Sequence, residues 1–146
     1  MTGADVIAHL PYQRPFLFVD EILSVNDETI RGSYTFREDE FFYAGHFVDH
    51  PVTPGVILLE CMAQIGLVSH GVYLLNQQQK PIPELVAFTS ADVNFLMPVA
   101  PGDRVEVNSS LEYFRMGKIK STVELKTDRG VACRGVLTGM LKSKKK

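Results

Sequence analysis

The sequence has only two cysteines and no excess of positive charge, and each shortage excludes a class of protein. Cys61 and Cys133 are too few for the disulfide framework of a small secreted domain, so we expect both to be buried thiols in a reducing compartment. Lysines and arginines number 15 against 17 aspartates and glutamates, which gives a formal net charge of −2. This balance argues against a nucleic-acid-binding domain, because such domains are usually basic.

The sequence also lacks internal repeats, low-complexity linkers and a basic, apolar leader at its start. With 146 residues, 45% of them hydrophobic, it is long enough to bury a core. We therefore expect a single domain over residues 1–146 and a cytoplasmic location. The lysine-rich end, residues 142–146, is predicted to be a solvated, frayed terminus.

The longest apolar stretch, residues 56–75, has the length of a membrane span. Glu60, Gln64 and His70 interrupt it, and no cluster of lysines or arginines flanks it closely. We therefore expect no membrane span here. The stretch is instead predicted to form a helix that is buried on most of its sides inside the fold.

The boundaries of this helix are marked by familiar signals. Thr53 followed by Pro54 is typical of a helix N-terminus, with Thr53 as the N-cap and proline at the first helical position. A polar stretch closed by Pro81 indicates an end near Asn76. A short helix is also expected over residues 5–10, ended by Pro11.

The segments around the long helix have the period-two or continuous apolar patterns that predict strands. These segments are residues 16–25, 29–37, 85–95, 104–113, 119–126 and 131–141. Their short, turn-like connections indicate an antiparallel meander. A single helix that is apolar on most faces needs a sheet that wraps around it, so the sequence predicts an α+β architecture with a curved antiparallel sheet.

The residues that could take part in catalysis are concentrated around the start of the long helix. His46 lies in a loop just ahead of it, and a histidine can act as a general base near neutral pH. Gly55 places a backbone N–H at the helix start with no side chain to block approach. Such a donor can polarise a carbonyl oxygen.

Glu60 and Gln64 are four residues apart and therefore share one face of the helix. A carboxylate in so apolar a helix is unfavourable unless it is paired, hydrogen-bonded or protonated, which makes Glu60 a functional candidate. Glu60 and Gly55 are separated by about 140° around the helix. If both serve one site, the carboxylate comes from a second chain, so the spacing indicates a dimer with its site at the interface.

Structural explanations of these residues remain open at this stage. His46 could be an ordinary surface residue without a catalytic role. Glu60 and Gln64 could form a polar pair whose role is purely structural. His46 and His50 have the spacing of metal ligands on a helix, but nearby prolines indicate a loop and no third ligand is evident. No phosphate loop, dinucleotide fingerprint or nucleophile elbow occurs.

Residues 45–64 read GHFVDHPVTPGVILLECMAQ, and this run closely resembles the β-hydroxyacyl-acyl-carrier-protein dehydratases of the FabZ type. Those enzymes show G-H-F-P-G-H-P-x-M-P-G-V followed by a Glu and A-Q. The resemblance extends to LPYQRPFLFVD at residues 10–20, to residues 95–103 and to MGKIK at residues 116–120. It covers nearly the whole chain and implies the hotdog fold, in which a sheet wraps around one long helix.

The resemblance also implies a site shared between two subunits and a role for each residue. His46 would remove the proton α to the thioester, while the Gly55 N–H holds the thioester oxygen. Glu60 of the partner subunit would protonate the departing β-hydroxyl through a water molecule. The Val52 carbonyl would fix the tautomer of His46, and Gln64 would orient Glu60 or its water. The family forms homodimers, often arranged as trimers of dimers.

No metal or redox cofactor is implied, because the substrate arrives on the phosphopantetheine arm of an acyl carrier protein. Some positions depart from the family pattern: Tyr12 replaces a histidine, Val48 and Asp49 replace Pro-Gly, Thr53 replaces methionine, and Asn94, Leu96 and Met97 replace basic residues expected to meet the acidic carrier. The alternatives to a dehydratase are a hotdog acyl thioesterase and a non-catalytic acyl-binding subunit. The intact His–Glu pair favours the dehydratase.

Overall fold

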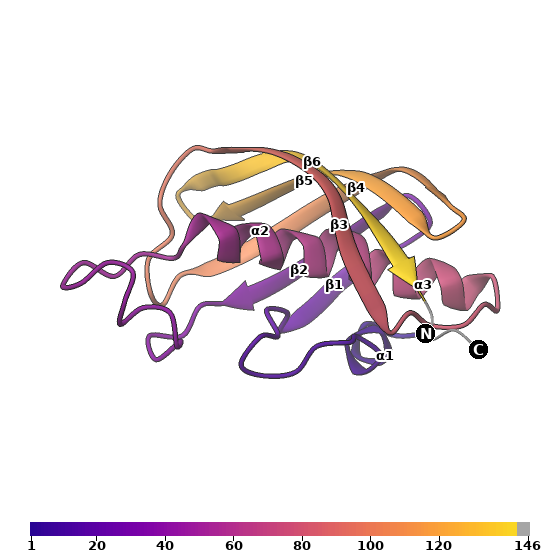
Figure 1. Ribbon diagram of the computed structural model, residues 1–146, viewed down its shortest axis with the longest axis horizontal. Helices are drawn as coiled ribbons and strands as arrows, with labels where there is room; N and C mark the ends of the chain where they lie inside the picture. The colour runs from indigo at the N-terminus through magenta and orange to yellow at the C-terminus, as the bar shows by residue number, and fades with distance from the viewer. Residues whose placement is uncertain (143–146) are drawn as a thin grey trace.

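The computed structural model describes residues 1–142, which form a six-stranded antiparallel sheet curved around one long helix (Figure 1). The strands are β1 (Glu21–Val25), β2 (Thr29–Thr35), β3 (Leu85–Phe95), β4 (Arg104–Arg115), β5 (Lys118–Thr127) and β6 (Gly130–Lys142). This arrangement confirms the predicted α+β hotdog fold. Apart from Lys142, which ends β6, the predicted frayed terminus lies outside the described residues.

The sheet order is β1-β2-β4-β5-β6-β3, so the strands do not form a simple meander. β1 pairs with β2, and β4, β5 and β6 follow as consecutive hairpins. β3 precedes them in the chain but pairs with β6 at the far edge of the sheet. The helix lies between β2 and β3 in sequence, and this connection lets the chain cross from one side of the sheet to the other (Figure 1).

The central helix is continuous over 23 residues but is not α-helical throughout. It consists of α2 (Gly55–Ala63), a π-helical segment η1 (Gln64–Ser69) and α3 (His70–Gln77). The Ser69 hydroxyl donates a hydrogen bond to the Gln64 carbonyl at 2.7 Å, and the Ser109 hydroxyl of β4 donates one to the Gly66 carbonyl at 3.2 Å. Serine hydroxyls thus supplement the backbone bonds of a segment whose i→i+5 geometry is rare.

By length and composition this helix would be able to cross a membrane. In the fold, however, 78% of its most apolar 18-residue window is buried by the rest of the chain. Its apolar surface is therefore accounted for by the core, as the polar interruptions in the sequence predict.

The helix does not begin as the sequence predicts. Its N-cap is Pro54, with no side-chain cap, and Thr53 is not the cap. The buried Thr53 hydroxyl instead shares a hydrogen bond of 2.6 Å with the Tyr43 hydroxyl. The capping prediction is wrong because a tertiary partner takes the hydroxyl that would otherwise accept from the first helical turn.

The predicted strand over residues 16–25 is also shorter in the structure, where only Glu21–Val25 is a strand. The preceding segment lies along the helix, and the Phe18 N–H donates to the side-chain oxygen of Gln64 at 2.8 Å. A side chain of the helix thus replaces the neighbouring strand as hydrogen-bond partner. Ahead of it, α1 (Gly3–Ala8) packs so closely on β1 that a Cβ at Gly3 would lie 2.7 Å from the Ile22 carbonyl oxygen.

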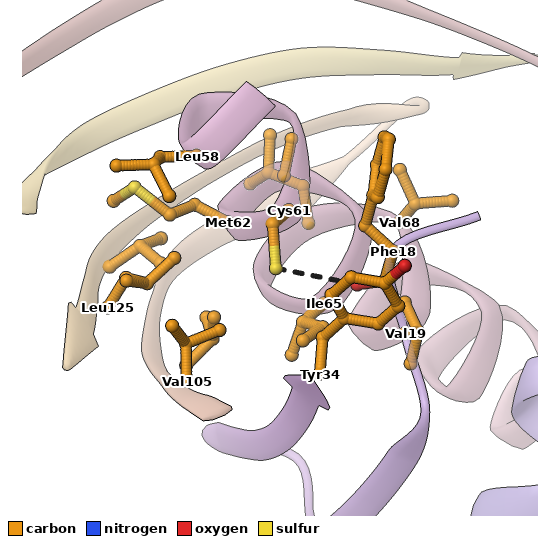
Figure 2. Packing of buried hydrophobic residues seen from close by; sticks show 14 of the residues in the cluster. Phe18, Val19, Tyr34, Leu58, Cys61, Met62, Ile65, Val68, Val105 and Leu125 are labelled. Carbon is orange, nitrogen blue, oxygen red and sulfur yellow. Dashed lines mark hydrogen bonds between the residues drawn. The ribbon is translucent and has the colours of Figure 1, made fainter. Parts of the chain in front are cut away.

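The core fills the space between the helix and the concave face of the sheet. Figure 2 shows helix side chains packed against side chains of the sheet and of the N-terminal segment: Leu58, Cys61, Met62, Ile65 and Val68 face Phe18, Tyr34, Val105 and Leu125. The Cys61 thiol donates to the Phe18 carbonyl at 3.4 Å. Cys61 and Cys133 are both free and buried, as predicted.

Candidate active site

The loop that carries His46 is closed by hydrogen bonds to Val52. The Val52 N–H donates to the His46 carbonyl at 2.9 Å, and Nδ1 of the His46 ring lies 3.1 Å from the Val52 carbonyl oxygen. Because a carbonyl only accepts, Nδ1 must carry a hydrogen in this contact, and in the neutral ring Nε2 then keeps its lone pair. The half-buried ring also stacks on Phe47, with centroids 4.1 Å apart.

The tip of this loop is a tight turn in which Phe47 and His50 exchange two backbone hydrogen bonds of 3.1 and 2.9 Å. Asp49 in the turn has a φ of 65°, the left-handed conformation that glycine adopts most easily. Aspartate is among the few other residues that tolerate this conformation. The replacement of the family's glycine by Asp49 is therefore compatible with the geometry of the turn.

The start of α2 presents a free backbone donor. Within residues 1–142, no group accepts a hydrogen bond from the Gly55 N–H. A surface hollow of about 320 Å³ lies beside it, lined by Thr53, Gly55, Leu58 and the end of β3. The Phe95 ring lies so close that a Cβ at position 55 would be 3.3 Å from it. Glycine thus leaves room for both the ring and an incoming oxygen atom.

Gln64 is fully buried, and both its side-chain amide nitrogen and its side-chain oxygen have hydrogen-bond partners. Its Nε2 group donates to Glu60 Oε2 at 3.0 Å and to the Phe16 carbonyl at 2.9 Å. Its Oε1 accepts from the Phe18 N–H at 2.8 Å. The amide cannot be flipped without losing these bonds, so Gln64 holds the Glu60 carboxyl in one orientation.

The environment of Glu60 favours its protonated form. Burial raises the pKa of the Glu60 carboxyl above its usual value, and the hydrogen bond from Gln64 opposes part of that rise. A raised pKa keeps the carboxyl protonated to a higher pH than in an exposed glutamate, as a proton donor requires.

The structure places Glu60 and Gly55 at different cavities. Glu60 lines a small cavity of about 120 Å³ between the helix, β3 and β6, and Tyr12 is its other polar neighbour there. Gly55 lies five residues earlier, about 7.5 Å along the helix axis and about 140° around it. The predicted donor to the thioester oxygen and the predicted acid thus face different directions within one chain.

Two of the other histidines, His9 and His70, have structural partners. His9 Nδ1 lies 2.8 Å from the Asp5 carbonyl, and the buried His70 shares a hydrogen bond of 2.8 Å with the Asn26 carbonyl. Burial lowers the pKa of His70. Within residues 1–142, no three histidine, cysteine or acidic side chains are grouped as metal ligands.

Sequence reasoning missed two contributions to this site. The backbone of Phe16 and Phe18 fixes Gln64, and Tyr12 lies at the cavity beside Glu60. The only signal in the sequence was the departure of Tyr12 from the family pattern.

Comparisons with known proteins identify the family of the chain. A sequence model of the FabA-like domain family matches residues 10–135. The 3-hydroxyacyl-[acyl-carrier-protein] dehydratase FabZ of Herpetosiphon aurantiacus is 35% identical over 130 residues, which cover 85% of this chain and 89% of that protein. The FabZ of Dechloromonas aromatica is 32% identical over 132 residues, which cover 88% of this chain and 89% of that protein.

Among solved structures, the dehydratase heterocomplex ApeI:P from Xenorhabdus doucetiae matches with a TM-score of 0.82 at 17% identity, covering 95% of this chain and 91% of that chain. Cj0977, a sigma28-regulated virulence protein from Campylobacter jejuni, matches with a TM-score of 0.67 at 12% identity. The match covers 97% of this chain and 91% of that chain. These two likenesses support the fold alone. The family match and the sequence relatives show that the chain belongs to the FabA-like family and resembles its FabZ members.

Proposed function

We propose that this protein dehydrates (3R)-3-hydroxyacyl-[acyl-carrier-protein] to trans-2-enoyl-[acyl-carrier-protein] in the cytoplasm, in fatty acid or related acyl or polyene biosynthesis. The observation that carries the proposal is the presence of a candidate base and a candidate acid in one chain. Val52 holds Nδ1 of His46, Nε2 of His46 has no hydrogen-bond partner among residues 1–142, and burial raises the pKa of Glu60. Glu60 follows His46 by fourteen residues, the spacing of the FabZ motif.

The elimination then needs three groups. His46 Nε2 removes the proton from the carbon α to the thioester, and the Gly55 N–H stabilises the negative charge that develops on the thioester oxygen. The bond from the β-carbon to its hydroxyl oxygen breaks with its electron pair, and Glu60 supplies the proton that completes a water molecule. Val52 and Gln64 position His46 and Glu60 and do not touch the substrate. The proposed elimination is redox-neutral and takes its proton transfers from His46 and Glu60, so it uses no metal or redox cofactor. The carrier's phosphopantetheine arm delivers the substrate.

The edge of the sheet supports a homodimer with shared sites. β1 at one edge is short and covered by α1, whereas β3 at the other edge is long and largely exposed. Three large apolar side chains of β3 are exposed: Leu85 at 66%, Phe88 at 43% and Phe95 at 52%. An uncovered apolar edge strand is a template for pairing with another chain. Pairing of two β3 strands would bury these side chains and bring Glu60 of the partner subunit toward His46; further assembly into a trimer of dimers is part of the same proposal.

The test is direct turnover of a β-hydroxyacyl thioester on a carrier protein, followed by conjugated enoyl absorbance and by mass. We expect turnover in the wild type and its loss in His46→Ala and in Glu60→Gln, with His9→Ala as the matched control. A denatured and refolded equal mixture of the two inactive variants should recover about one quarter of wild-type activity, because half of the dimers are mixed and each holds one intact site. Recovery near zero would place both residues in the same chain.

The same assay separates the proposed reaction from its alternatives. Release of free thiol without loss of water would identify a thioesterase. Binding of the acyl carrier without either product would identify a non-catalytic subunit. Either result would contradict the dehydratase proposal.

A further inference from the structure

The loop that carries His46 is closed by hydrogen bonds at three levels. Its tip is closed by backbone groups alone, and His46 and Val52 are joined by two contacts further back. At its base, the hydroxyl groups of Tyr43 and Thr53 share a hydrogen bond of 2.6 Å. This outermost bond joins two side chains, and it brings together the residue that enters the loop and the residue that leaves it.

Both ends of this bond are anchored in the core. The Tyr43 side chain is buried, its N–H donates to the Glu40 carbonyl at 3.2 Å, and its ring packs edge-on against Phe42 with centroids 4.7 Å apart. Thr53 is also buried, and its N–H donates to the carbonyl of the fully buried Val99 at 2.9 Å. The hydroxyl bond therefore sets the spacing between two segments that are each fixed separately.

The bond joins two neutral groups away from water. Burial raises the pKa of Tyr43 to about 12, so at neutral pH both hydroxyls keep their protons. Removal of one hydroxyl would leave the other buried without this partner, which is unfavourable. The FabZ pattern has methionine at the position of Thr53, and methionine has no hydroxyl. The bond is therefore a feature of this chain and does not come with the family motif.

We propose that Tyr43 and Thr53 are positioning residues that hold the His46 loop closed against the start of α2. The inference rests on the proposed dehydratase function. Thr53 directly follows Val52, whose carbonyl fixes Nδ1 of His46, and it precedes Gly55 by two residues. The bond thus restrains both the base and the backbone N–H proposed to hold the thioester oxygen. The two hydroxyls act through these groups and take no part in the proton transfers.

The kinetic test removes each hydroxyl separately and then both together, as Tyr43→Phe, Thr53→Val and the double variant. Because a displacement of about 1 Å can cost about 100-fold in rate, we expect kcat of each single variant to fall by about 10- to 100-fold with KM nearly unchanged. The double variant should be no slower than the slower single variant, since the second change removes no further bond. Thr53→Ser, which keeps the hydroxyl, should retain most of the wild-type kcat.

Matched controls make the same chemical changes elsewhere. Tyr113→Phe removes a phenol hydroxyl on β4 and should behave as wild type. Thr127→Val removes a buried hydroxyl that accepts from the Arg129 N–H at 3.0 Å in the turn between β5 and β6, so it should lower the urea midpoint and leave kcat unchanged. A kcat within twofold of wild type in both Tyr43→Phe and Thr53→Val, or losses that add in the double variant, would overturn the inference.

The ring nitrogens of His46 give a readout that does not need turnover. Since Nδ1 carries the hydrogen toward the Val52 carbonyl, we expect nitrogen NMR shifts of the neutral ring to report the Nδ1–H form in the wild type, with His46→Ala identifying the signals. In Tyr43→Phe and Thr53→Val these shifts should move toward a mixture with the Nε2–H form, and unchanged shifts would overturn the inference. Absence of wild-type turnover would overturn the proposed function, whereas the shifts would still decide whether the two hydroxyls position His46.

Discussion

Replacing Gln64 by leucine tests how the N-terminal segment holds the acid. Leucine has a similar size but no polar atoms, so the Gln64→Leu change removes three hydrogen bonds at once. The buried Phe18 N–H is left without a partner, which costs about 1–3 kcal/mol, and each of the other bonds contributes about 0.5–1.5 kcal/mol. The added apolar burial of leucine offsets part of this loss.

We therefore expect Gln64→Leu to lower the free energy of unfolding by about 2–4 kcal/mol, a large part of the 5–15 kcal/mol typical of a domain. Urea unfolding at fixed protein concentration measures it, with circular dichroism as the probe because the sequence has no tryptophan. The matched control is Gln13→Leu, the same change at an exposed position, which should shift stability by less than about 0.5 kcal/mol.

The same variant makes a prediction about pH. The hydrogen bond from Gln64 favours the charged carboxylate of Glu60, so its removal raises the pKa of Glu60 further. If Glu60 is the acid, the fall in kcat on the alkaline side should move to higher pH. A stability loss equal to that of Gln13→Leu, or an unchanged pH profile, would refute the reasoning about Gln64.

Three further predictions concern other parts of the fold. Burial raises the pKa of Glu60, so between the usual pKa of 4.5 and the raised pKa the folded state binds more protons than the unfolded state. The free energy of unfolding therefore falls as pH rises through this range. Urea titrations of Glu60→Gln should lack this fall. In Gly135→Ala, the new Cβ would lie 2.0 Å from the Asp92 carbonyl oxygen of β3, so we expect the free energy of unfolding to fall by about 1–3 kcal/mol. The proposed dimer through β3 should also dissociate more readily, as measured by size-exclusion chromatography. Burial raises the pKa of the Cys61 thiol, so iodoacetamide should modify Cys61 only in unfolded protein, and mass-spectrometric detection of the adduct on native protein would count against this burial.

The sequence predicted most of the elements because their signals are local. Period-two patterns gave β3 (Leu85–Phe95) with both of its boundaries. The proline at position 54 and the polar stretch closed by Pro81 gave the ends of the long helix to within a residue or two. The four-residue spacing of Glu60 and Gln64 placed their side chains in contact, as the 3.0 Å hydrogen bond confirms. The roles of His46, Val52, Gly55, Glu60 and Gln64 came from the family resemblance and stay predictions until turnover is measured.

What the sequence determined by itself was thus the set of elements, the fold class and the family, since these depend on patterns repeated over a few residues. Tertiary structure alone decided three features: the diversion of the Thr53 hydroxyl to Tyr43, the loss of strand ahead of Glu21, and the position of Tyr12 beside Glu60. Each depends on a partner outside the local pattern, which is 10 residues away for Thr53 and Tyr43 and 46 residues away for Phe18 and Gln64. Whether a side chain bonds to a local or a distant partner depends on which one lies nearer in the folded molecule. The local periodicity of the sequence does not report that distance in space.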